Sequence, residues 1–402
     1  MNKTKNLLTI ALLGIFGFSN SVNAMDLADF IDESIEASPK IKALESAHYA
    51  DLEAVKQEVY FWHPSLKYEL EQNIKVENRA EARDSTITMR SNLLQGNRSD
   101  VMDGLNTAAD ISLLAVEMEE DSMKARILSS VYKIALFENL IEEGQRIIDE
   151  AQAINSDISL KVDGGLAKIS DSTTAMVLLK EMESTILALQ LRIDQLKIDL
   201  EASTGRPYPV DLTVPVSKVV AFVNQQPNTS TENNLALKRK RLEVKSARHA
   251  HNAADNWYSL DAYVKTEFNE YDFANKSTEI GFELTIDLIN PSNYWNDRKR
   301  VHSVQSERYQ LDQLERDVSL GLTAQINIFE SNMSLWESLV ESLEYKKSLI
   351  DERHNEYEIN LTSLYELIQS WSSYYSTVQQ KTDTEATLVD TMISSMMMSG
   401  DL

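Results

Sequence analysis

The residues of this 402-residue chain that could catalyse a reaction or bind a metal are few and scattered. The chain contains six histidines and no cysteine, which excludes thiolate metal sites and disulfide bonds. His249 and His251 stand two positions apart, so on a helix they would face different directions. The sequence has no His-x-x-x-His pair, no calcium-type spacing of acids and no glycine-rich phosphate loop. We therefore expect neither an enzyme nor a metal or cofactor site.

The other feature of the sequence that bears on function is its charge. The chain has 63 acidic and 39 basic residues and a formal net charge of −24, which disfavours nucleic acid and anionic membrane faces as partners. Two acids stand shortly after segments that would break a helix: Asp171 follows 163–165 (Asp-Gly-Gly), and Glu366 follows 358–360 (Glu-Ile-Asn). An acid near a helix start is favoured by the helix dipole, so both can also be ordinary solvated hairpin residues.

Long amphipathic helices must position these acids. Apolar residues step by three and four, or recur every seven positions, through 127–148, 179–200, 318–350 and 364–378. The last of these seams weakens at Thr382 and Glu385. Residues 99–155 contain no proline, and as one helix they would be about 85 Å long. Such a length indicates a rod or a tube rather than a globular core.

Four other segments alternate apolar and polar residues with period two, as strands with one oily face do. In the first, Leu66, Tyr68 and Leu70 alternate with Lys67 and Glu69. The segments are 66–77, 87–93, 260–268 and 280–288. Each has roughly the ten residues that a tilted strand needs to cross an outer membrane, although four strands of a soluble sheet would show the same pattern. Aromatic residues cluster at their ends, as in a membrane girdle: Tyr60, Phe61, Trp62, Trp257, Tyr258, Tyr294 and Trp295.

The two halves of the sequence resemble each other. Pro64-Ser65-Leu66 recurs about 194 residues later as Tyr258-Ser259-Leu260. Each half reads helix, strand, strand, helix, turn, helix. Because four strands cannot close a barrel and open edges are not viable in lipid, we expect three chains to pool twelve strands. The expected divisions are a signal peptide at 1–24, a first repeat at 25–203, a linker at 204–233 and a second repeat at 234–402.

The signal peptide is indicated by three features. Lys3 and Lys5 precede an apolar run from Leu7 to Phe18, and Val22-Asn23-Ala24 has the small residues of a cleavage site. The run is too short to span a bilayer, although a retained N-terminal anchor is the alternative. We expect the mature chain to leave the cytoplasm.

The order of these features resembles the TolC family, the trimeric outer-membrane factors of Gram-negative tripartite efflux pumps and type I secretion systems. Near each turn the sequence follows the family's pattern, in which an acid stands six residues after a glycine: Gly165 and Asp171, then Asn360 and Glu366. The resemblance implies a mainly α fold with some β structure. It would consist of long coiled-coil hairpins and four transmembrane strands per chain, with a trimer forming a 12-stranded β-barrel continuous with an α-helical barrel.

The resemblance also implies where such a duct closes. The positions that match the family's gate and constriction are Ser170, Asp171, Tyr357, Thr362, Glu366 and Gln369. The family's gate arginine falls on Thr362, and one of its two constriction acids falls on Gln369, so one carboxylate remains. We expect weaker bonds between the helices at the closed end, and less negative charge around the constriction, than in the family. Three Glu366 side chains near a threefold axis would repel, raise each other's pKa and attract cations.

The function implied is that of a passive exit duct in the outer membrane, spanning into the periplasm. Its partners would be two further copies of the chain, outer-membrane lipid, a periplasmic adaptor (membrane fusion) protein, and an inner-membrane pump or ABC transporter. The adaptor would dock at the hairpin turns, at Gly164, Gly165, Leu166, Asn360 and Leu361. The alternative is a soluble periplasmic coiled-coil adaptor or scaffold without a pore. The cargo, drugs or a secreted protein, is not indicated.

Overall fold

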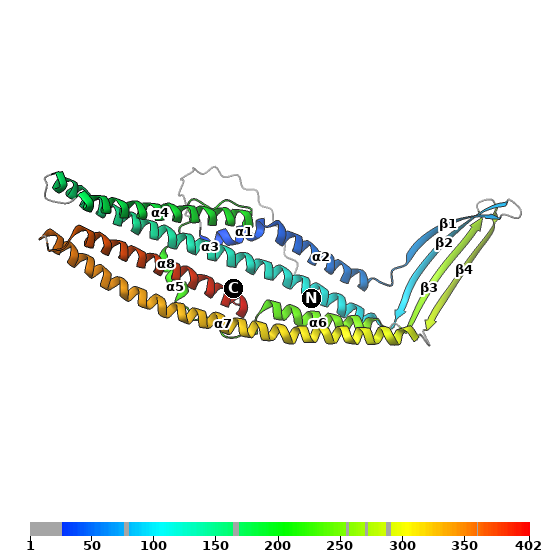
Figure 1. The fold of residues 1–402 in the computed structure, drawn as a ribbon. Coiled ribbons are helices and arrows are strands. Elements are labelled where there is room, and N and C mark those ends of the chain that lie inside the picture. The colour runs from blue at the N-terminus through cyan, green and yellow to red at the C-terminus, as the bar shows by residue number, and fades with distance from the viewer. Residues whose placement is uncertain are drawn as a thin grey trace, which may run out of the picture.

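The computed structural model describes residues 26–75, 80–163, 169–254, 257–269, 272–286, 291–359 and 361–402. The expected signal peptide at 1–24 and the turn residues Gly164, Gly165, Leu166 and Asn360 lie outside these ranges. The chain is a long rod of helices that ends in a small sheet (Figure 1). The helices are α1 (Leu27–Ala37), α2 (Pro39–Val59), α3 (Arg98–Asp163), α4 (Ile169–Thr204), α5 (Val216–Val223), α6 (Leu235–Ala253), α7 (Pro291–Glu358) and α8 (Leu364–Ser399). The strands are β1 (Ser65–Lys75), β2 (Ala80–Gln95), β3 (Tyr258–Asn269) and β4 (Asp272–Ile286).

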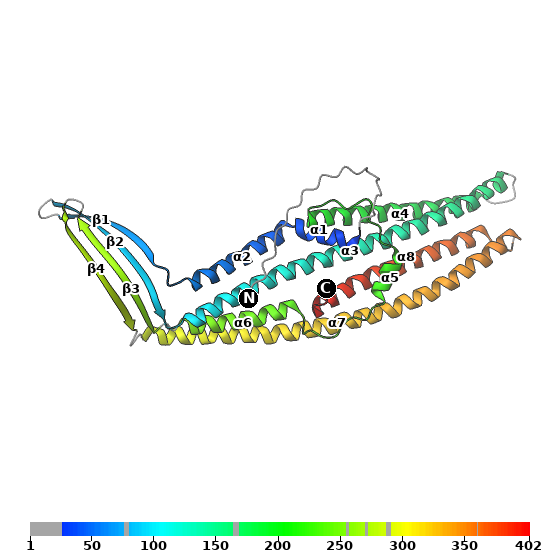
Figure 2. The same cartoon turned by 180° about the vertical axis from the view of Figure 1, so that it is seen from behind.

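The two halves of the chain build matching series of elements. Helices α3 and α7 have 66 and 68 residues, and the helices that follow them, α4 and α8, both have 36. Far from the sheet the helices pack in the order α4, α3, α8, α7; near the sheet the order is α2, α3, α6, α7 (Figures 1 and 2). Helices α3 and α7 therefore run the length of the rod, and shorter helices complete the layer.

The seams predicted from heptad spacing form the core. Ile127, Ile134 and Ile148 are at most 2% exposed. The apolar series of α4 is also buried, as Leu179, Met182, Ile186, Leu189, Ile193 and Leu200. Where the α8 seam weakens in sequence, Thr382 and Glu385 are buried too. The coiled-coil packing therefore continues through polar residues there.

The four strands form one antiparallel sheet in the order β1-β2-β3-β4, so β2 and β3 join the two halves of the chain. Leu66, Met89, Val264 and Ile280 stand opposite one another in successive strands and share one face. The predicted apolar face is thus formed, and it lies open: Ile280 is 79% exposed in the single chain. At the helical end of β2 a bulge shifts the register between Asn92 and Leu94, and Leu94 pairs with Leu260, whereas the alternation through 87–93 predicts Leu93 on the apolar face.

The opposite face of the sheet is charged. Arg90 reaches Glu283 at 2.6 Å and lies 3.9 Å from Asp261, linking three strands, and Lys67 pairs with Glu69 at 2.5 Å. A hollow of about 750 Å³ lies on this face. A sheet that lies between water and lipid requires one polar face and one apolar face.

Two short helices are absent from the sequence-based expectation. Helix α1 is separate from α2 because Ser38 caps α2 and Pro39 occupies its first turn. Helix α5 lies within the segment expected to be a loop-like linker, with Val219 and Val223 buried. Both helices depend on contacts with distant parts of the chain, such as Phe30 of α1 against Tyr208.

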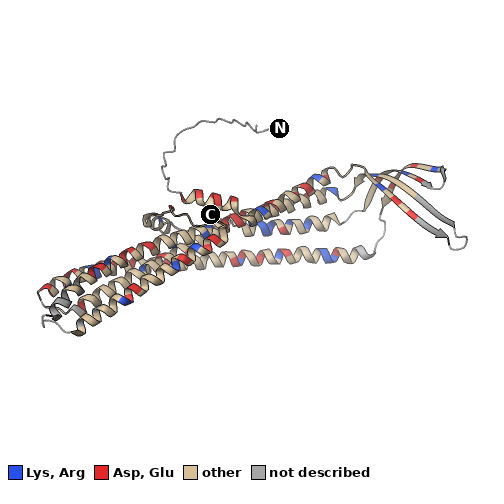
Figure 3. Ribbon diagram, turned by 90° about the horizontal axis from the view of Figure 1, so that it is seen from above, with Lys and Arg blue, Asp and Glu red and all other residues tan. Residues whose placement is uncertain are grey.

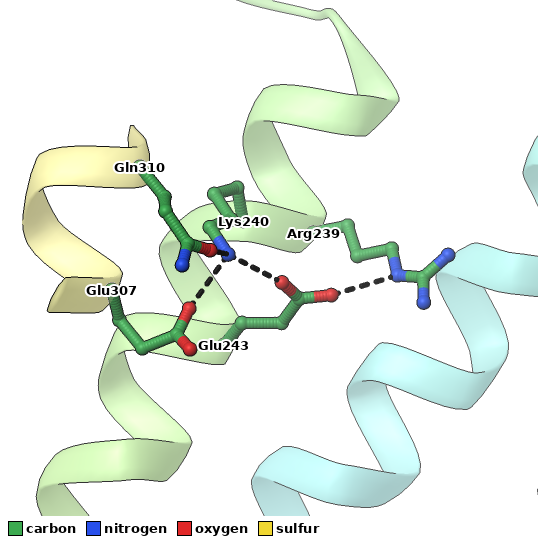
Figure 4. A network of polar contacts seen from close by, with 5 residues as sticks. All are labelled: Arg239, Lys240, Glu243, Glu307 and Gln310. Carbon is green, nitrogen blue, oxygen red and sulfur yellow. Dashed lines mark hydrogen bonds and ion pairs between the residues drawn. The ribbon is translucent and has the colours of Figure 1, made fainter. Parts of the chain in front are cut away.

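Polar contacts fix how α6 packs on α7 (Figure 4). The Lys240 ammonium donates to Glu307 at 2.6 Å, Gln310 at 2.7 Å and Glu243 at 3.1 Å, and Arg239 donates to Glu243 at 3.0 Å. Burial works against the charged form of Lys240, but the hydrogen bonds to Glu307 and Glu243 outweigh it and the pKa is raised. Lys240 therefore stays charged and fixes the register of the two helices.

Candidate functional site

The end of the rod opposite the sheet holds the residues singled out from sequence. Both hairpin tips, α3–α4 and α7–α8, lie at this end (Figures 1 and 2). The α7–α8 tip closes with a hydrogen bond from the Leu361 amide to the Glu356 carbonyl at 2.8 Å. Helix α8 then begins with a capping box: Ser363 Oγ accepts from the Glu366 amide, and the Glu366 carboxylate accepts from the Ser363 amide.

The Glu366 carboxylate is the centre of a polar cluster at this tip. Its Oε2 accepts from Thr362 Oγ1 at 2.5 Å and from the Ser363 amide at 3.2 Å. Arg353 of α7 reaches across the hairpin, with Nη1 at 3.3 Å from both Glu366 Oε2 and Thr362 Oγ1. The Thr362 hydroxyl, the Ser363 amide and the Arg353 charge hold the pKa of Glu366 below its ordinary value of 4.5.

Arg353 was not identified from sequence. The family's gate arginine matches Thr362, yet this hairpin places a guanidinium beside Thr362 from the other helix. A signal was present, because Lys346, Ile350, Arg353 and Tyr357 continue the 4, 3, 4 spacing of the α7 seam. The sequence therefore put Arg353 on the face of α7 that meets α8.

The other predicted gate residues are placed as follows. Tyr357 is half-buried one turn after Arg353, and Gln369 is exposed one turn after Glu366. Ser170 is exposed in the first turn of α4, on the other hairpin. Asp171 belongs to the same turn, and its side chain lies outside the described residues. The contacts therefore bring together Thr362 and Glu366 of the predicted set, and they add Arg353.

A hollow of about 510 Å³ adjoins the cluster, lined by Lys346, Arg353, Glu366, Gln369 and neighbouring hydroxyl groups. Lys346 donates across the hairpin to the Ser373 carbonyl at 3.1 Å and to Thr377 Oγ1 at 2.5 Å. The hollow therefore has polar walls of both charges.

Further from the tip, polar links continue along the α7–α8 seam. The Glu385 carboxylate, buried, accepts from Trp336 Nε1 at 2.9 Å and from Lys381 at 2.6 Å. The α3–α4 seam is apolar over the corresponding stretch of α4. Because polar groups in a seam are satisfied in one register only, these links fix the register of the α7–α8 hairpin.

Helix α8 also crosses α3 in close contact. A Cβ on Gly144 would lie 2.7 Å from the Tyr375 hydroxyl, so a larger residue there would require Tyr375 to move. Tyr374 donates to Glu143 at 3.2 Å. Hydrogen bonding to Arg146 is the main reason that the pKa of Glu143 is lowered. The two hairpins are thus joined by tight packing and by a charged link.

Within the described ranges, no cluster of histidine and acidic side chains suits a metal ion. None of the helices in those ranges has a long enough apolar stretch to cross a membrane.

Comparison with known proteins places the fold among outer-membrane channels. VceC, the outer membrane protein of Vibrio cholerae, aligns with a TM-score of 0.74 at 10% identity, over 93% of this chain and 96% of that one. The open-state MtrE outer membrane channel of Neisseria gonorrhoeae aligns with a TM-score of 0.75 at 10% identity, over 93% and 89%. The CmeC outer membrane channel of Campylobacter jejuni aligns with a TM-score of 0.74 at 10% identity, over 93% and 85%.

No family model and no curated protein matches the sequence. At 10% identity these alignments show a shared fold. The mostly helical fold with a small sheet, expected from the resemblance, is therefore confirmed. The similar structures are channels rather than enzymes, in keeping with the scarcity of catalytic motifs in the sequence.

Proposed function

We propose that this chain belongs to the TolC family and forms an outer-membrane channel of a Gram-negative bacterium that extends into the periplasm. It would serve as the passive exit duct of a tripartite efflux pump or a type I secretion system. The observation that carries the proposal is a fold shared with outer-membrane channels along 93% of the chain. The sheet adds support, since it exposes an apolar face opposite a charged one.

The proposed assembly is a homotrimer. The outer edges of β1 and β4 have no partner strand in the described part of the chain. Unpaired edges are costly in lipid because no water satisfies their backbone groups. Because the four strands alternate in direction, β4 of one copy can pair antiparallel with β1 of the next, and three copies supply twelve strands.

The flanking helices support the same assembly. In the half of the rod far from the sheet, α4 and α7 lie at the two sides of the helical layer. Each has a second apolar series that the single chain leaves exposed: Val177, Leu187, Leu191 and Ile198 on α4, and Leu320, Ile328, Leu335 and Leu349 on α7. Packing α7 of one copy against α4 of the next would bury both series and close the helices into a tube.

The gate would lie at the hairpin tips, formed by the six predicted residues Ser170, Asp171, Tyr357, Thr362, Glu366 and Gln369. We further propose that Arg353 supplies the guanidinium that Thr362 does not. It would hold Glu366 within its own hairpin, which differs from the weaker bonds expected from sequence. The link between Arg353, Thr362 and Glu366 would keep the α7–α8 tip compact in the closed state.

The adaptor would dock at the turns, through Gly164, Gly165 and Leu166 on one hairpin and Asn360 and Leu361 on the other. Leu361 is 76% exposed at the tip, which suits contact with a partner helix. The adaptor would connect the duct to an inner-membrane pump or ABC transporter. Drugs and secreted proteins are both possible cargoes of such a duct.

Two measurements test the proposal. The protein should be recovered in the outer-membrane fraction, and purified protein should produce discrete conductance steps in a planar lipid bilayer. Recovery as a water-soluble periplasmic protein that never conducts would favour the alternative, a coiled-coil adaptor or scaffold without a pore.

A further inference from the structure

Helix α6 departs from the acidity of the chain. Its 19 residues contain six lysines and arginines and one acid, whereas acidic residues are spread along the other helices (Figure 3). Lys238, Arg241, Lys245 and Arg248 are spaced 3, 4 and 3 apart, so they lie on one face of the helix; Arg241, Lys245 and Arg248 are exposed, and Lys238 is half-buried. This face is distinct from the one that carries Lys240 against α7.

This basic face borders a matching face of α7. Arg241 pairs with Glu315 of α7 at 3.0 Å. Arg308 stands seven residues before Glu315 and lies on the same face of α7, and Arg298 stands a further ten residues back, about 80° round the helix from Arg308. The two faces therefore lie on one side of the α6–α7 pair.

That side is the outer side of the proposed tube. Continuing in steps of three and four on α7 beyond Glu315 reaches Glu330 and Met333, which line one hollow together with linker residues Gln226 and Pro227. The linker packs on one side of the helical layer and would fill the bore if that side faced inward. The basic face of α6 therefore faces away from the tunnel.

At the membrane end of this face, Arg248 and Arg298 lie at similar positions along the axis of the rod. Helices α6 and α7 are antiparallel, with His251 against Asp297 at 3.4 Å and Lys240 against Glu307 at 2.6 Å. This register places Arg248 and Arg298 within about one helical turn of each other along the axis. The aromatic residues expected at the membrane interface, Trp257, Tyr294 and Trp295, stand just above them.

The patch formed by Lys245, Arg248 and Arg298 is open to a ligand. In the described ranges no carboxylate lies within ion-pair distance of any of the three. Arg298 contacts Tyr294, with its guanidinium 5.7 Å from the ring centre and its Nη1 3.5 Å from the hydroxyl. The nearby acid Asp297 has its carboxylate 3.4 Å from His251 Nδ1. The acidity of the whole chain is therefore locally reversed.

We propose that Lys245, Arg248 and Arg298 bind the phosphate headgroup of an anionic phospholipid in the periplasmic leaflet, a step that rests on the proposed membrane channel. Guanidinium groups bind phosphate oxygens through paired hydrogen bonds, and lysine adds a flexible charge. The aromatic residues above lie where headgroups lie, so the phosphate is within side-chain reach. On this proposal, the patch is an exception to the expectation that the acidic chain avoids anionic membrane faces.

The test uses the full-length protein in nanodiscs made of equal parts phosphatidylethanolamine and phosphatidylglycerol. Native mass spectrometry would measure the ratio of the two lipids retained after gentle delipidation. We expect the wild type to retain phosphatidylglycerol preferentially, and the double variant Arg248→Gln/Arg298→Gln to bind it roughly 30-fold more weakly, since each basic group contributes to headgroup affinity.

The matched control is Lys238→Gln/Arg308→Gln. It likewise removes one positive charge each from α6 and α7, with each site ten residues, or about 15 Å, farther from the sheet. The control should retain phosphatidylglycerol like the wild type. Equal retention by all three proteins would overturn the headgroup site, as would equal loss in both variants, which would indicate diffuse charge attraction.

A second arm separates lipid from free phosphate. Inorganic phosphate added to the wild type at millimolar concentration should leave the retained lipid ratio unchanged, and displacement of the lipid would overturn the assignment to a lipid headgroup. Insertion into the nanodisc without lipid preference would overturn this site and leave the channel intact. Failure to insert would overturn both proposals.

Discussion

Glu366 performs two tasks at the tip of the α7–α8 hairpin. Its carboxylate caps α8 through the Ser363 amide and joins α8 to α7 through Arg353 and Thr362. A carboxylate that accepts several hydrogen bonds and faces a guanidinium favours its charged form, which explains the lowered pKa. The repulsion expected among three Glu366 side chains would act against this local stabilisation.

Replacing Arg353 tests the tip. Arg353→Ala removes the guanidinium from Glu366 and Thr362, so the α7–α8 tip should loosen and the resting single-channel conductance should rise. Arg353→Lys keeps the charge and should fall between the alanine variant and the wild type. A conductance unchanged in Arg353→Ala would show that this link does not maintain the closed state.

The pH dependence of the resting conductance follows from Glu366. Because its folded pKa lies below its ordinary value of 4.5, the stabilisation from its charge is fully present above pH 4.5. It is lost as the pH falls through the folded pKa. Conductance recorded from pH 7 to 3 should therefore rise in the acidic range for the wild type. In Glu366→Gln it should already be raised at pH 7 and lack the part of the acid response due to this group; an identical acid response in both would contradict the assignment.

Sequence could indicate only part of this site. Thr362 and Glu366 are four residues apart at a helix start, so their proximity followed from local spacing. Arg353 lay on the predicted seam of α7, but which side chain of α8 it meets depends on how the hairpin closes. The spacing along α7 indicates the face on which Arg353 lies, but its partner on the other helix has no local sequence signature.

At the scale of elements, two glycines in long helices make a matched pair. An alanine Cβ at Gly144 would lie 2.7 Å from the Tyr375 hydroxyl, so Tyr375 would have to move. At Gly321 the nearest atom would be Met398 Cε at 3.4 Å, the end of a flexible side chain. Gly144→Ala should lower the unfolding free energy by about 1–3 kcal/mol through overpacking. Gly321→Ala should leave it unchanged or raise it by up to about 1 kcal/mol through helix propensity.

Thermal unfolding followed by circular dichroism checks this pair. Both variants replace a helical glycine by alanine, so a difference between them isolates the Tyr375 contact. Equal melting temperatures in the two variants would mean that the contact between α3 and α8 accommodates the added methyl group without loss of stability.

The long elements were predictable because periodicity along one helix or strand requires no knowledge of the partner. The seams of α3, α4, α7 and α8 and the alternating strands are of this kind. Helices α1 and α5 were missed because they are short and are held by distant residues, as Phe30 is by Tyr208. The bulge that brings Leu94 rather than Leu93 onto the apolar face likewise depends on pairing with β3.

For the whole molecule, both ends of the single chain present surfaces that the proposed trimer would cover. In the described part of the chain the sheet has two unpaired edges, and far from the sheet α4 and α7 flank the helical layer with exposed apolar residues. Burying these surfaces between copies would stabilise the assembly through the hydrophobic effect without altering the core of each chain.

Leu191→Glu tests the helical contact between copies. Leu191 is 70% exposed in the single chain, so the variant should fold, but a buried charge between copies should weaken the trimer. Sedimentation velocity in detergent should then show dissociation at concentrations where the wild type remains assembled. Val210→Glu, at a linker position that is 94% exposed, is the control and should leave the assembly intact. Equal assembly in both variants would exclude the α4–α7 contact.

The central claim is that three copies of this chain form one channel in the outer membrane. The most direct measurement is the mass of the full-length protein extracted in detergent from outer membranes, obtained by light scattering with the contribution of detergent subtracted. A mass of three chains is expected. A monomer or dimer recovered from the water-soluble fraction would contradict it.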